Sequence, residues 1–268
     1  MNNVGRQVAG TATLFMGAFI IAWDDFVTPW VNVTLSGTAR EWIAYFTGAL
    51  LMVAGAGLFW RRTSQLASLV LAFIFIAFSV FWVKAIVNAP LVYDPNWGCF
   101  AEISSITAGF LALFTSLAKQ KTDAVVRLAI ASRLWFGICS ISFMVVHFVT
   151  FSRSANFVPH WMPFGGAFWN AATGVAHLMV AIALLSGICA LAAARMAALM
   201  YLAFGVLGWG TALVETWGTK LATKPNVHFM WGAEVITFVL AAAVWMVGDS
   251  VAAFPPKDGE RFMLGASL

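Results

Sequence analysis

The amino-acid sequence predicts an all-α, polytopic membrane protein with eight transmembrane helices, arranged as two parallel four-helix repeats with pseudo-twofold symmetry. Composition is the first observation behind this prediction. Hydrophobic residues make up 62% of the 268 residues and charged residues only 10%, whereas about 25% of the residues of a soluble domain are charged. A transmembrane β-barrel is excluded because the apolar runs are long and lack an alternating pattern.

The second observation is the length of the apolar segments. A transmembrane helix needs about 20 apolar residues, with a range of roughly 17 to 25. The segments of this length are residues 8–30, 41–60, 65–87, 100–117, 126–151, 165–187, 191–214 and 229–247. We expect none of these spans to be broken at its centre.

The third observation is an internal repeat. The sequence Asp25-Phe26-Val27-Thr28 returns as His147-Phe148-Val149-Thr150, and other short stretches recur in the same order. The further pairs are 44–48 with 171–174, 51–54 with 178–181, and 95–96 with 225–226. A duplicated unit places matched residues about a pseudo-twofold axis. We therefore predict a first repeat at residues 1–120, a second at 121–253 and a short cytoplasmic tail at 254–268.

The distribution of basic residues predicts the orientation. With eight spans, ten of the 15 lysines and arginines lie on the side of the termini. The positive-inside rule then places both termini in the cytoplasm, and we assign the chain to the cell inner membrane as a multi-pass protein. The basic residues form no run, so a nucleic-acid partner is not predicted and the lipid bilayer is the expected contact.

Acidic residues and histidines concentrate on the opposite, periplasmic half, where three pairs occupy matched positions of the two repeats. These pairs are Glu102 with Glu234, Lys84 with Glu215, and Asp25 with His147. Ionisable groups inside a membrane pair with one another or border water. One interpretation is a periplasm-facing polar pocket between the repeats, with catalytic residues Asp25, Glu102, His147, Glu215 and Glu234. The alternative is that Lys84 pairs with a carboxylate and Asp25 with His147, fixing helix register.

His177, Trp217 and His228 are the candidate cofactor contacts. His177 is also explained as a hydrogen-bonded core residue. Histidine and carboxylate ligands suit iron, copper or zinc, but no H-x-x-x-H or E-x-x-H spacing occurs on one helix face, so no metal site is assigned. The three cysteines have no C-x-x-C spacing, which argues against a thiol redox motif.

Part of the second half resembles the DoxX-like membrane proteins. The resemblance lies in His147-Phe148-Val149, residues 157–163 (FVPHWMP), residues 173–177 (TGVAH) and residues 192–197 (AAARMA). His177 stands where the family has a glutamate, and family members are commonly single four-helix units.

The resemblance implies a repeated four-helix bundle, and one relative is the membrane subunit of a thiosulfate:quinone oxidoreductase. We therefore expect an integral membrane subunit of a quinone-linked oxidoreductase, with a quinone or another lipid-soluble molecule as its small-molecule partner. The alternatives are a non-catalytic accessory subunit that stabilises a larger membrane complex, and an acid–base enzyme acting on an isoprenoid-type lipid. The expected assembly is a homo-oligomer or a subunit of a membrane complex.

Overall fold

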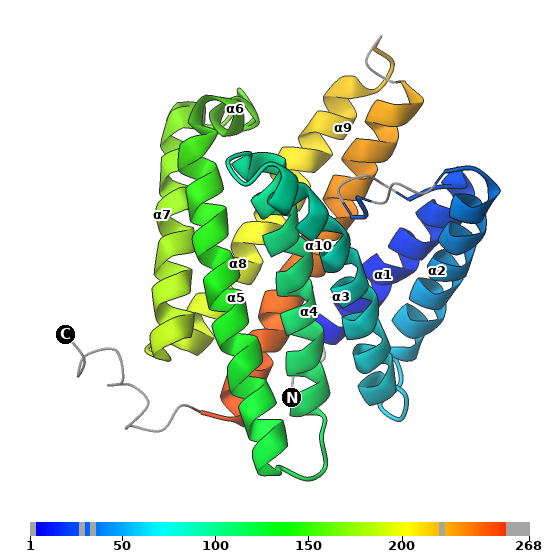
Figure 1. Cartoon of the computed structure of the whole chain (residues 1–268). Coiled ribbons are helices and arrows are strands. Elements are labelled where there is room, and N and C mark those ends of the chain that lie inside the picture. Colours follow the sequence, from blue (N-terminus) through cyan, green and yellow to red (C-terminus); the bar gives the residue numbers. More distant parts are fainter. Residues whose placement is uncertain (1–3, 27–29, 33–35, 220–222, 256–268) are drawn as a thin grey trace.

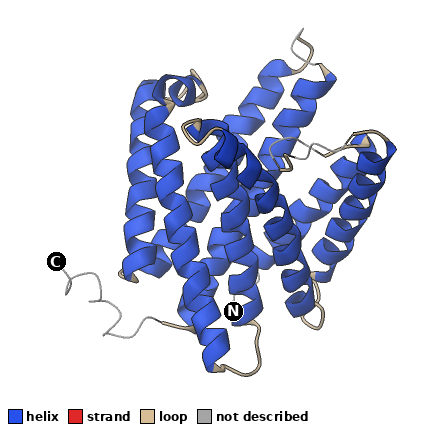
Figure 2. Cartoon of the chain, in the orientation of Figure 1, coloured by secondary structure: helices blue, strands red, loops and turns tan. Residues whose placement is uncertain are grey.

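The computed structural model describes residues 4–26, 30–32, 36–219 and 223–255, and within these ranges the chain contains helices and connections but no strand (Figure 2). The predicted tail from residue 256 onward lies outside the described residues, as do Val27, Thr28 and Lys220.

The helices follow the predicted apolar segments closely. They are α1 (Val4–Trp23), α2 (Thr38–Gly57), α3 (Ser64–Asn88), η1 (Tyr93–Trp97), α4 (Gly98–Ser116), α5 (Asp123–Val149), α6 (Phe151–Asn156), α7 (Gly165–Ser186), α8 (Ala190–Ala203), η2 (Phe204–Trp209), α9 (Gly210–Thr216) and α10 (Lys224–Ala253). Seven helical stretches in the described part are long and apolar enough to cross a membrane. The chain therefore has the architecture of a multi-pass membrane protein.

The second predicted span, α2, is helical but is not among these seven. Its first turn carries Arg40 and Glu41, and much of the rest is alanine and glycine, which lowers its hydropathy. The first span also differs from the prediction, because α1 ends at Trp23 rather than at residue 30. Asp24 adopts a left-handed backbone with φ of 59°, and this conformation cannot continue a right-handed helix.

The seventh predicted span contains an irregularity that we did not expect. Its helix runs from α8 through the π-helical segment η2 into α9. The Gly210 N–H donates to the Gly205 carbonyl, a bond that reaches five residues back rather than four. Glycine favours helices weakly, and three glycines occur between residues 205 and 210. At Gly205 the missing side chain also admits the Phe238 ring of α10, 2.9 Å from where a Cβ atom would lie.

Helices α4 and α10 form the centre of the molecule (Figure 1). They cross closely where Gly109 lies directly against the backbone of Ala243. Helix α10 also packs on α1 and α8, and α4 packs on α3 and α5. The outer helices form the pairs α1 with α2 and α5 with α7. Small residues at such crossings allow the close backbone approach that stabilises helices in a membrane.

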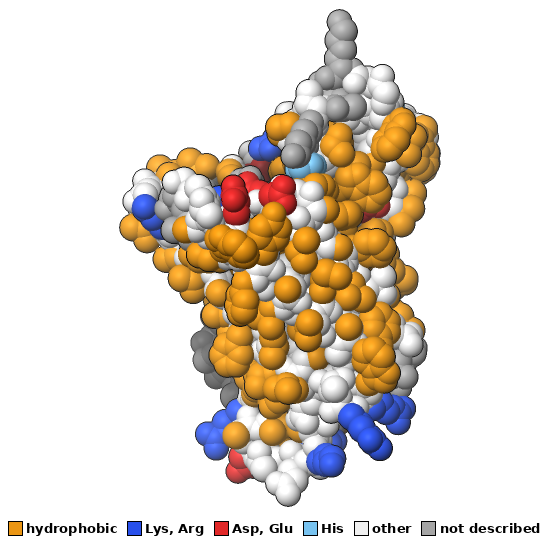
Figure 3. Space-filling view, turned by 90° about the vertical axis from the view of Figure 1, so that its right-hand side faces the viewer, with side chains coloured by type: hydrophobic (Ala, Val, Ile, Leu, Met, Phe, Trp, Pro, Cys, Tyr) orange, Lys and Arg blue, Asp and Glu red, His pale blue; other side chains and the backbone are white. Residues whose placement is uncertain are grey.

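Charged side chains gather toward the two ends of the helices and leave an apolar band between them. Figure 3 shows hydrophobic side chains over the middle of the molecule, with lysines and arginines at its lower end. Exposed Phe46, Val53, Phe73, Met179 and Met196 belong to the apolar surface. Such a surface suits contact with lipid. The lower end holds the α4–α5 connection, and the upper end holds η1, α6 and the end of α9 (Figure 1).

Candidate functional site

The most closely connected polar residues near the upper end come from α5, α7 and α8. His147 lies in the last turn of α5, Asn170 and His177 lie on α7, and Tyr201 lies on α8. We call these four residues the histidine cluster. Asn170, His177 and Tyr201 are each 2% exposed, so three of the four polar side chains are buried among the helices.

Hydrogen bonds join the four residues of the histidine cluster in two pairs, each across a helix interface. His147 Nδ1 and Asn170 Oδ1 are 2.7 Å apart, and Asn170 Nδ2 donates to the His147 backbone carbonyl at 2.9 Å. The Tyr201 hydroxyl lies 3.3 Å from His177 Nδ1. The centroids of the two imidazole rings lie 5.2 Å apart, and the ring planes are tilted by 35°. Two sequence-predicted residues, His147 and His177, are thus brought together.

Aromatic rings and one glycine surround the histidine cluster. Phe143 of α5 lies 5.3 Å from the His177 ring, and Phe204, the first residue of η2, lies 6.3 Å from both imidazoles. Gly174 permits the approach of α5, because a Cβ atom there would lie 3.1 Å from the His147 side chain. The cluster therefore combines groups that hydrogen-bond and exchange protons with faces that can stack against a flat ring.

Glu102, near the start of α4, lies close to this cluster without joining its hydrogen bonds. It lies within electrostatic range of Tyr201 and Asp94. Its carboxyl group has no hydrogen bond or ion pair with any residue that the structure describes. Two residues further along α4, Ser104 Oγ lies 3.5 Å from Cys139 Sγ, which joins α4 to α5.

Glu234 belongs to α10. Its Oε1 atom faces Gly210, where η2 ends and α9 begins. Its Oε2 atom is fully buried and has no hydrogen-bond partner among the described residues. Just above it is a small cavity of about 20 Å³, which we call the α9–α10 cleft. The cleft is lined by Leu213, Thr216, Trp217, Val227, Met230 and Trp231.

Asp25 lies apart from the histidine cluster. It forms an ion pair with Arg40 Nε at 2.5 Å, and the Arg40 guanidinium lies over the Phe26 ring. The predicted alternative pairing of Asp25 with His147 does not occur, because α1 and α5 lie on opposite sides of the central pair α4 and α10 (Figure 1). Lys84 is exposed and takes part in none of the ion pairs described for the chain.

Glu215 lies at the surface, on the far face of α9 from Glu234. It lines an open cavity of about 110 Å³ together with His160 and Phe157 from the connection between α6 and α7. His228, the third candidate cofactor contact, stacks on Trp23 of α1 with the ring centroids 4.0 Å apart. The sequence-predicted residues thus occupy five separate places rather than one pocket.

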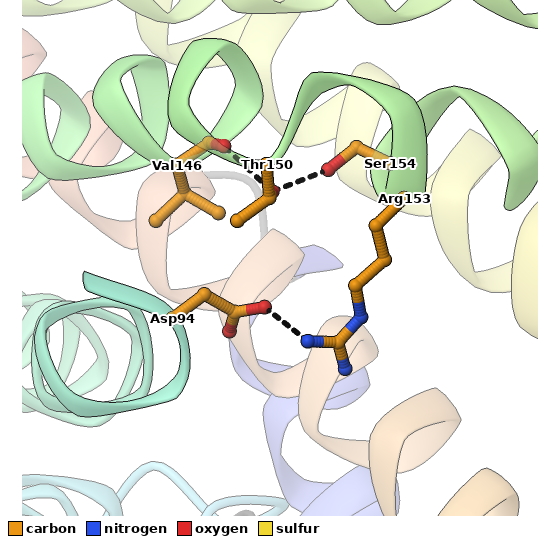
Figure 4. A network of polar contacts seen from close by, with 5 residues as sticks. All are labelled: Asp94, Val146, Thr150, Arg153 and Ser154. Carbon is orange, nitrogen blue, oxygen red and sulfur yellow. Dashed lines mark hydrogen bonds and ion pairs between the residues drawn. The ribbon is translucent and has the colours of Figure 1, made fainter. Parts of the chain in front are cut away.

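A further polar network fixes the upper ends of α5 and α6 near η1 (Figure 4). Arg153 Nη1 donates to Asp94 Oδ2 at 2.9 Å and so joins α6 to η1. Thr150 Oγ1 donates to the Val146 carbonyl at 2.8 Å and lies 2.9 Å from Ser154 Oγ. The Arg153 side chain is 75% exposed, which indicates a surface contact that positions segments rather than a reactive centre.

Sequence reasoning missed Asn170 and Tyr201. Both are polar groups within apolar spans, which is the signal that singled out Glu102 and Glu234. Within the described part of the chain, no three histidine, cysteine, aspartate or glutamate side chains lie close enough together to hold a metal ion.

No protein-family model, curated protein or solved structure matches this chain.

Proposed function

We propose that the chain is an integral membrane subunit of a quinone-linked oxidoreductase, with the quinone headgroup bound at the histidine cluster. The observation that carries the proposal is the pairing of His147 and His177, whose rings lie 5.2 Å apart beside Phe143 and Phe204. The resemblance of this half of the chain to the DoxX-like proteins points to the same chemistry.

The residues of the cluster suit such a headgroup. Imidazole and phenol groups donate hydrogen bonds to carbonyl oxygens and exchange protons with them. His147 lies nearest to the end of its helix, so it is the residue placed to exchange protons with the aqueous side. The ring faces of Phe143 and Phe204 would hold a flat ring, since aromatic groups favour stacked or edge-on contacts. A bound quinone would supply two-electron redox chemistry, with the electrons delivered by a partner subunit.

The same proposal includes eight spans, two parallel repeats and cytoplasmic termini in the cell inner membrane. Its support is the pattern of packed helices. The pairs α1–α2, α2–α3 and α3–α4 of the first repeat correspond to α5–α7, α7–α8 and α8–α10 of the second. The contacts of α4 with α5 and of α10 with α1 also correspond to each other. The basic side chains at the lower end support the orientation (Figure 3).

Quinone binding can be tested with the purified full-length chain. A short-chain ubiquinone analogue is titrated into the protein in mild detergent, and quenching of tryptophan fluorescence reports binding. We expect His177→Leu and Tyr201→Phe to weaken binding at least about tenfold, which corresponds to about 1.4 kcal/mol. His160→Gln, an exposed histidine outside the cluster, is the matched control and should bind as the unchanged protein does.

Three results would contradict the proposal. If the unchanged protein binds no quinone but co-purifies with a constant partner, the chain is an accessory subunit. If it retains an isoprenoid lipid and not quinone, the acid–base alternative gains support. Equal binding by all variants would place the quinone elsewhere.

A further inference from the structure

The unpartnered carboxyl group of Glu234 carries an inference that is independent of quinone binding. Its Oε2 atom is fully enclosed and lacks a hydrogen-bond donor. The group lies in α10, a membrane-spanning helix in which an uncompensated negative charge is costly. A buried carboxylate is stabilised by a donor or a cation, and in the described structure neither comes from a protein side chain.

The wall opposite Glu234 presents a second oxygen rather than a donor. A Cβ atom on Gly210 would lie 3.9 Å from Glu234 Oε1 and 3.4 Å from the Gly205 carbonyl oxygen. Both oxygens therefore border the space next to Gly210, which has no side chain to fill it. The Gly205 carbonyl accepts the Gly210 N–H, and a carbonyl oxygen has a second lone pair.

The ionisable groups on the neighbouring helices do not compensate this charge. Those toward the upper end include Glu102 on α4, His147 on α5, Tyr201 on α8 and Glu215 on α9, and no hydrogen bond or ion pair joins any of them to Glu234 in the described structure. Toward the lower end, Arg6 of α1 bonds to Ser64 and Arg195 of α8 pairs with Asp249. The site is thus negative and lacks a counter-charge from the protein.

We propose that Glu234 and the Gly205 carbonyl form a binding site for one positive charge, either a proton or a sodium ion. The α9–α10 cleft lies between the site and the upper end. Met230 and Trp231 line the cleft one turn before Glu234, and Val227 lines it two turns before. Residues three, four and seven positions apart share one helix face, so Glu234 lies on the face of α10 that forms the cleft.

Dicyclohexylcarbodiimide, an apolar reagent, tests the site in the full-length protein without any mutation. It reacts with a protonated carboxyl group: the carboxyl oxygen bonds to the central carbon of the reagent and the proton moves to a reagent nitrogen. The acyl group then migrates to nitrogen and leaves a stable acylurea. Mass spectrometry of the α10 peptide should show this adduct on Glu234 near neutral pH. A water-soluble carbodiimide with an added amine should instead modify exposed Glu215.

Sodium distinguishes the two cations. The reaction is run in excess sodium chloride and in excess choline chloride. If Glu234 is labelled less in sodium chloride than in choline chloride, the site binds sodium. Equal labelling of Glu234 in both salts identifies a proton site. Glu234→Gln is the control for assignment of the adduct, and the result on the unchanged protein stands even if that variant fails to fold.

Two outcomes would overturn the proposal. One is the absence of an adduct on Glu234 near neutral pH in both salts. The other is modification of Glu234 by the water-soluble reagent as readily as Glu215, which would mean that water rather than a bound cation solvates the carboxylate.

Discussion

His147 and Asn170 are joined by two hydrogen bonds in opposite directions. Asn170 Nδ2 donates to the His147 backbone carbonyl at 2.9 Å, so Asn170 Oδ1 must be the atom that faces His147 Nδ1 at 2.7 Å. An amide oxygen only accepts, and Nδ1 therefore carries a proton. In the neutral ring Nε2 is then the acceptor. The pair fixes both the orientation and the tautomer of the histidine that we place at the aqueous end of the cluster.

Replacing Asn170 with alanine should destabilise the protein by about 1–3 kcal/mol, because the His147 ring and carbonyl lose their buried partner. Thermal denaturation in detergent measures the change. Asn156→Ala is the control, since Asn156 is exposed, and its effect should stay within about 0.5 kcal/mol. Equal melting temperatures for the two variants would show that the His147–Asn170 pair does not support the fold.

The helices were predictable from the sequence because long apolar runs are a local signal. The helices that we expected at residues 65–87 and 165–187 appear as α3 (Ser64–Asn88) and α7 (Gly165–Ser186). The partners of the polar residues were not predictable, because they depend on which helices pack together. His147 and Asp25 occupy matched positions, yet one contacts Asn170 and the other Arg40.

The π-helical segment η2 escaped prediction for a different reason. Three glycines between residues 205 and 210 weaken the helix there, but α2 also contains three glycines, Gly48, Gly55 and Gly57, and remains a regular helix. The approach of Phe238 to Gly205 belongs to the packing of α10. The corresponding stretch in the first half of the chain belongs to α3, which is a regular helix. The two halves therefore differ at η2, the segment between the histidine cluster and Glu234.

The ion pair of Arg195 and Asp249 should contribute far more to stability than that of Arg153 and Asp94. Asp249 is 7% exposed and accepts from Arg195 Nη2 at 2.5 Å, while the Arg195 guanidinium also lies over the Trp245 ring. Arg195→Ala leaves a buried carboxylate and should cost about 3–5 kcal/mol. Arg153→Ala removes a surface pair worth about 0–1 kcal/mol.

Denaturant titration of both arginine variants checks this difference. Because Arg195→Ala can fail to fold, the double variant Arg195→Met with Asp249→Leu is added. It removes both charges and should recover much of the loss, since the unpaired charge is the main cost. A double variant as unstable as the single one would show that packing, and not the charge, is decisive.

The crossing of α1 and α2 should not tolerate side chains at its glycines. A Cβ atom on Gly17 would overlap the Gly48 carbonyl, and one on Gly48 would lie 2.9 Å from the Gly17 carbonyl. Backbone atoms cannot move aside as a flexible side chain can, so we expect Gly17→Ala to cost about 1–3 kcal/mol. Gly208→Ala meets only the exposed Phe157 ring at 3.3 Å and should change stability by less than about 1 kcal/mol. Urea or heat denaturation of the two variants in the same detergent decides the point.

The proposed orientation predicts which positions a membrane-impermeant maleimide can reach. In a chain whose three cysteines are changed to serine, single cysteines are introduced as Arg62→Cys, Lys119→Cys and Ser152→Cys. These positions lie in the α2–α3 connection, in the α4–α5 connection and on α6, and all three are exposed. Only Ser152→Cys should react in intact spheroplasts, and the other two should react after permeabilisation, because basic connections stay in the cytoplasm.

A single cysteine in the α1–α2 connection decides whether α2 crosses the membrane. Arg40 and Glu41 make α2 less apolar than the other long helices, but both lie in its first turn, where charged groups reach the interface. Helix α1 packs along the whole of α2, so the two should cross the membrane together. Ser36→Cys, exposed in the α1–α2 connection, should then react from outside, while Arg62→Cys stays protected as Lys119→Cys does. If neither Ser36→Cys nor Arg62→Cys reacts from outside, α2 does not cross, which would leave seven spans and place the two termini on opposite sides.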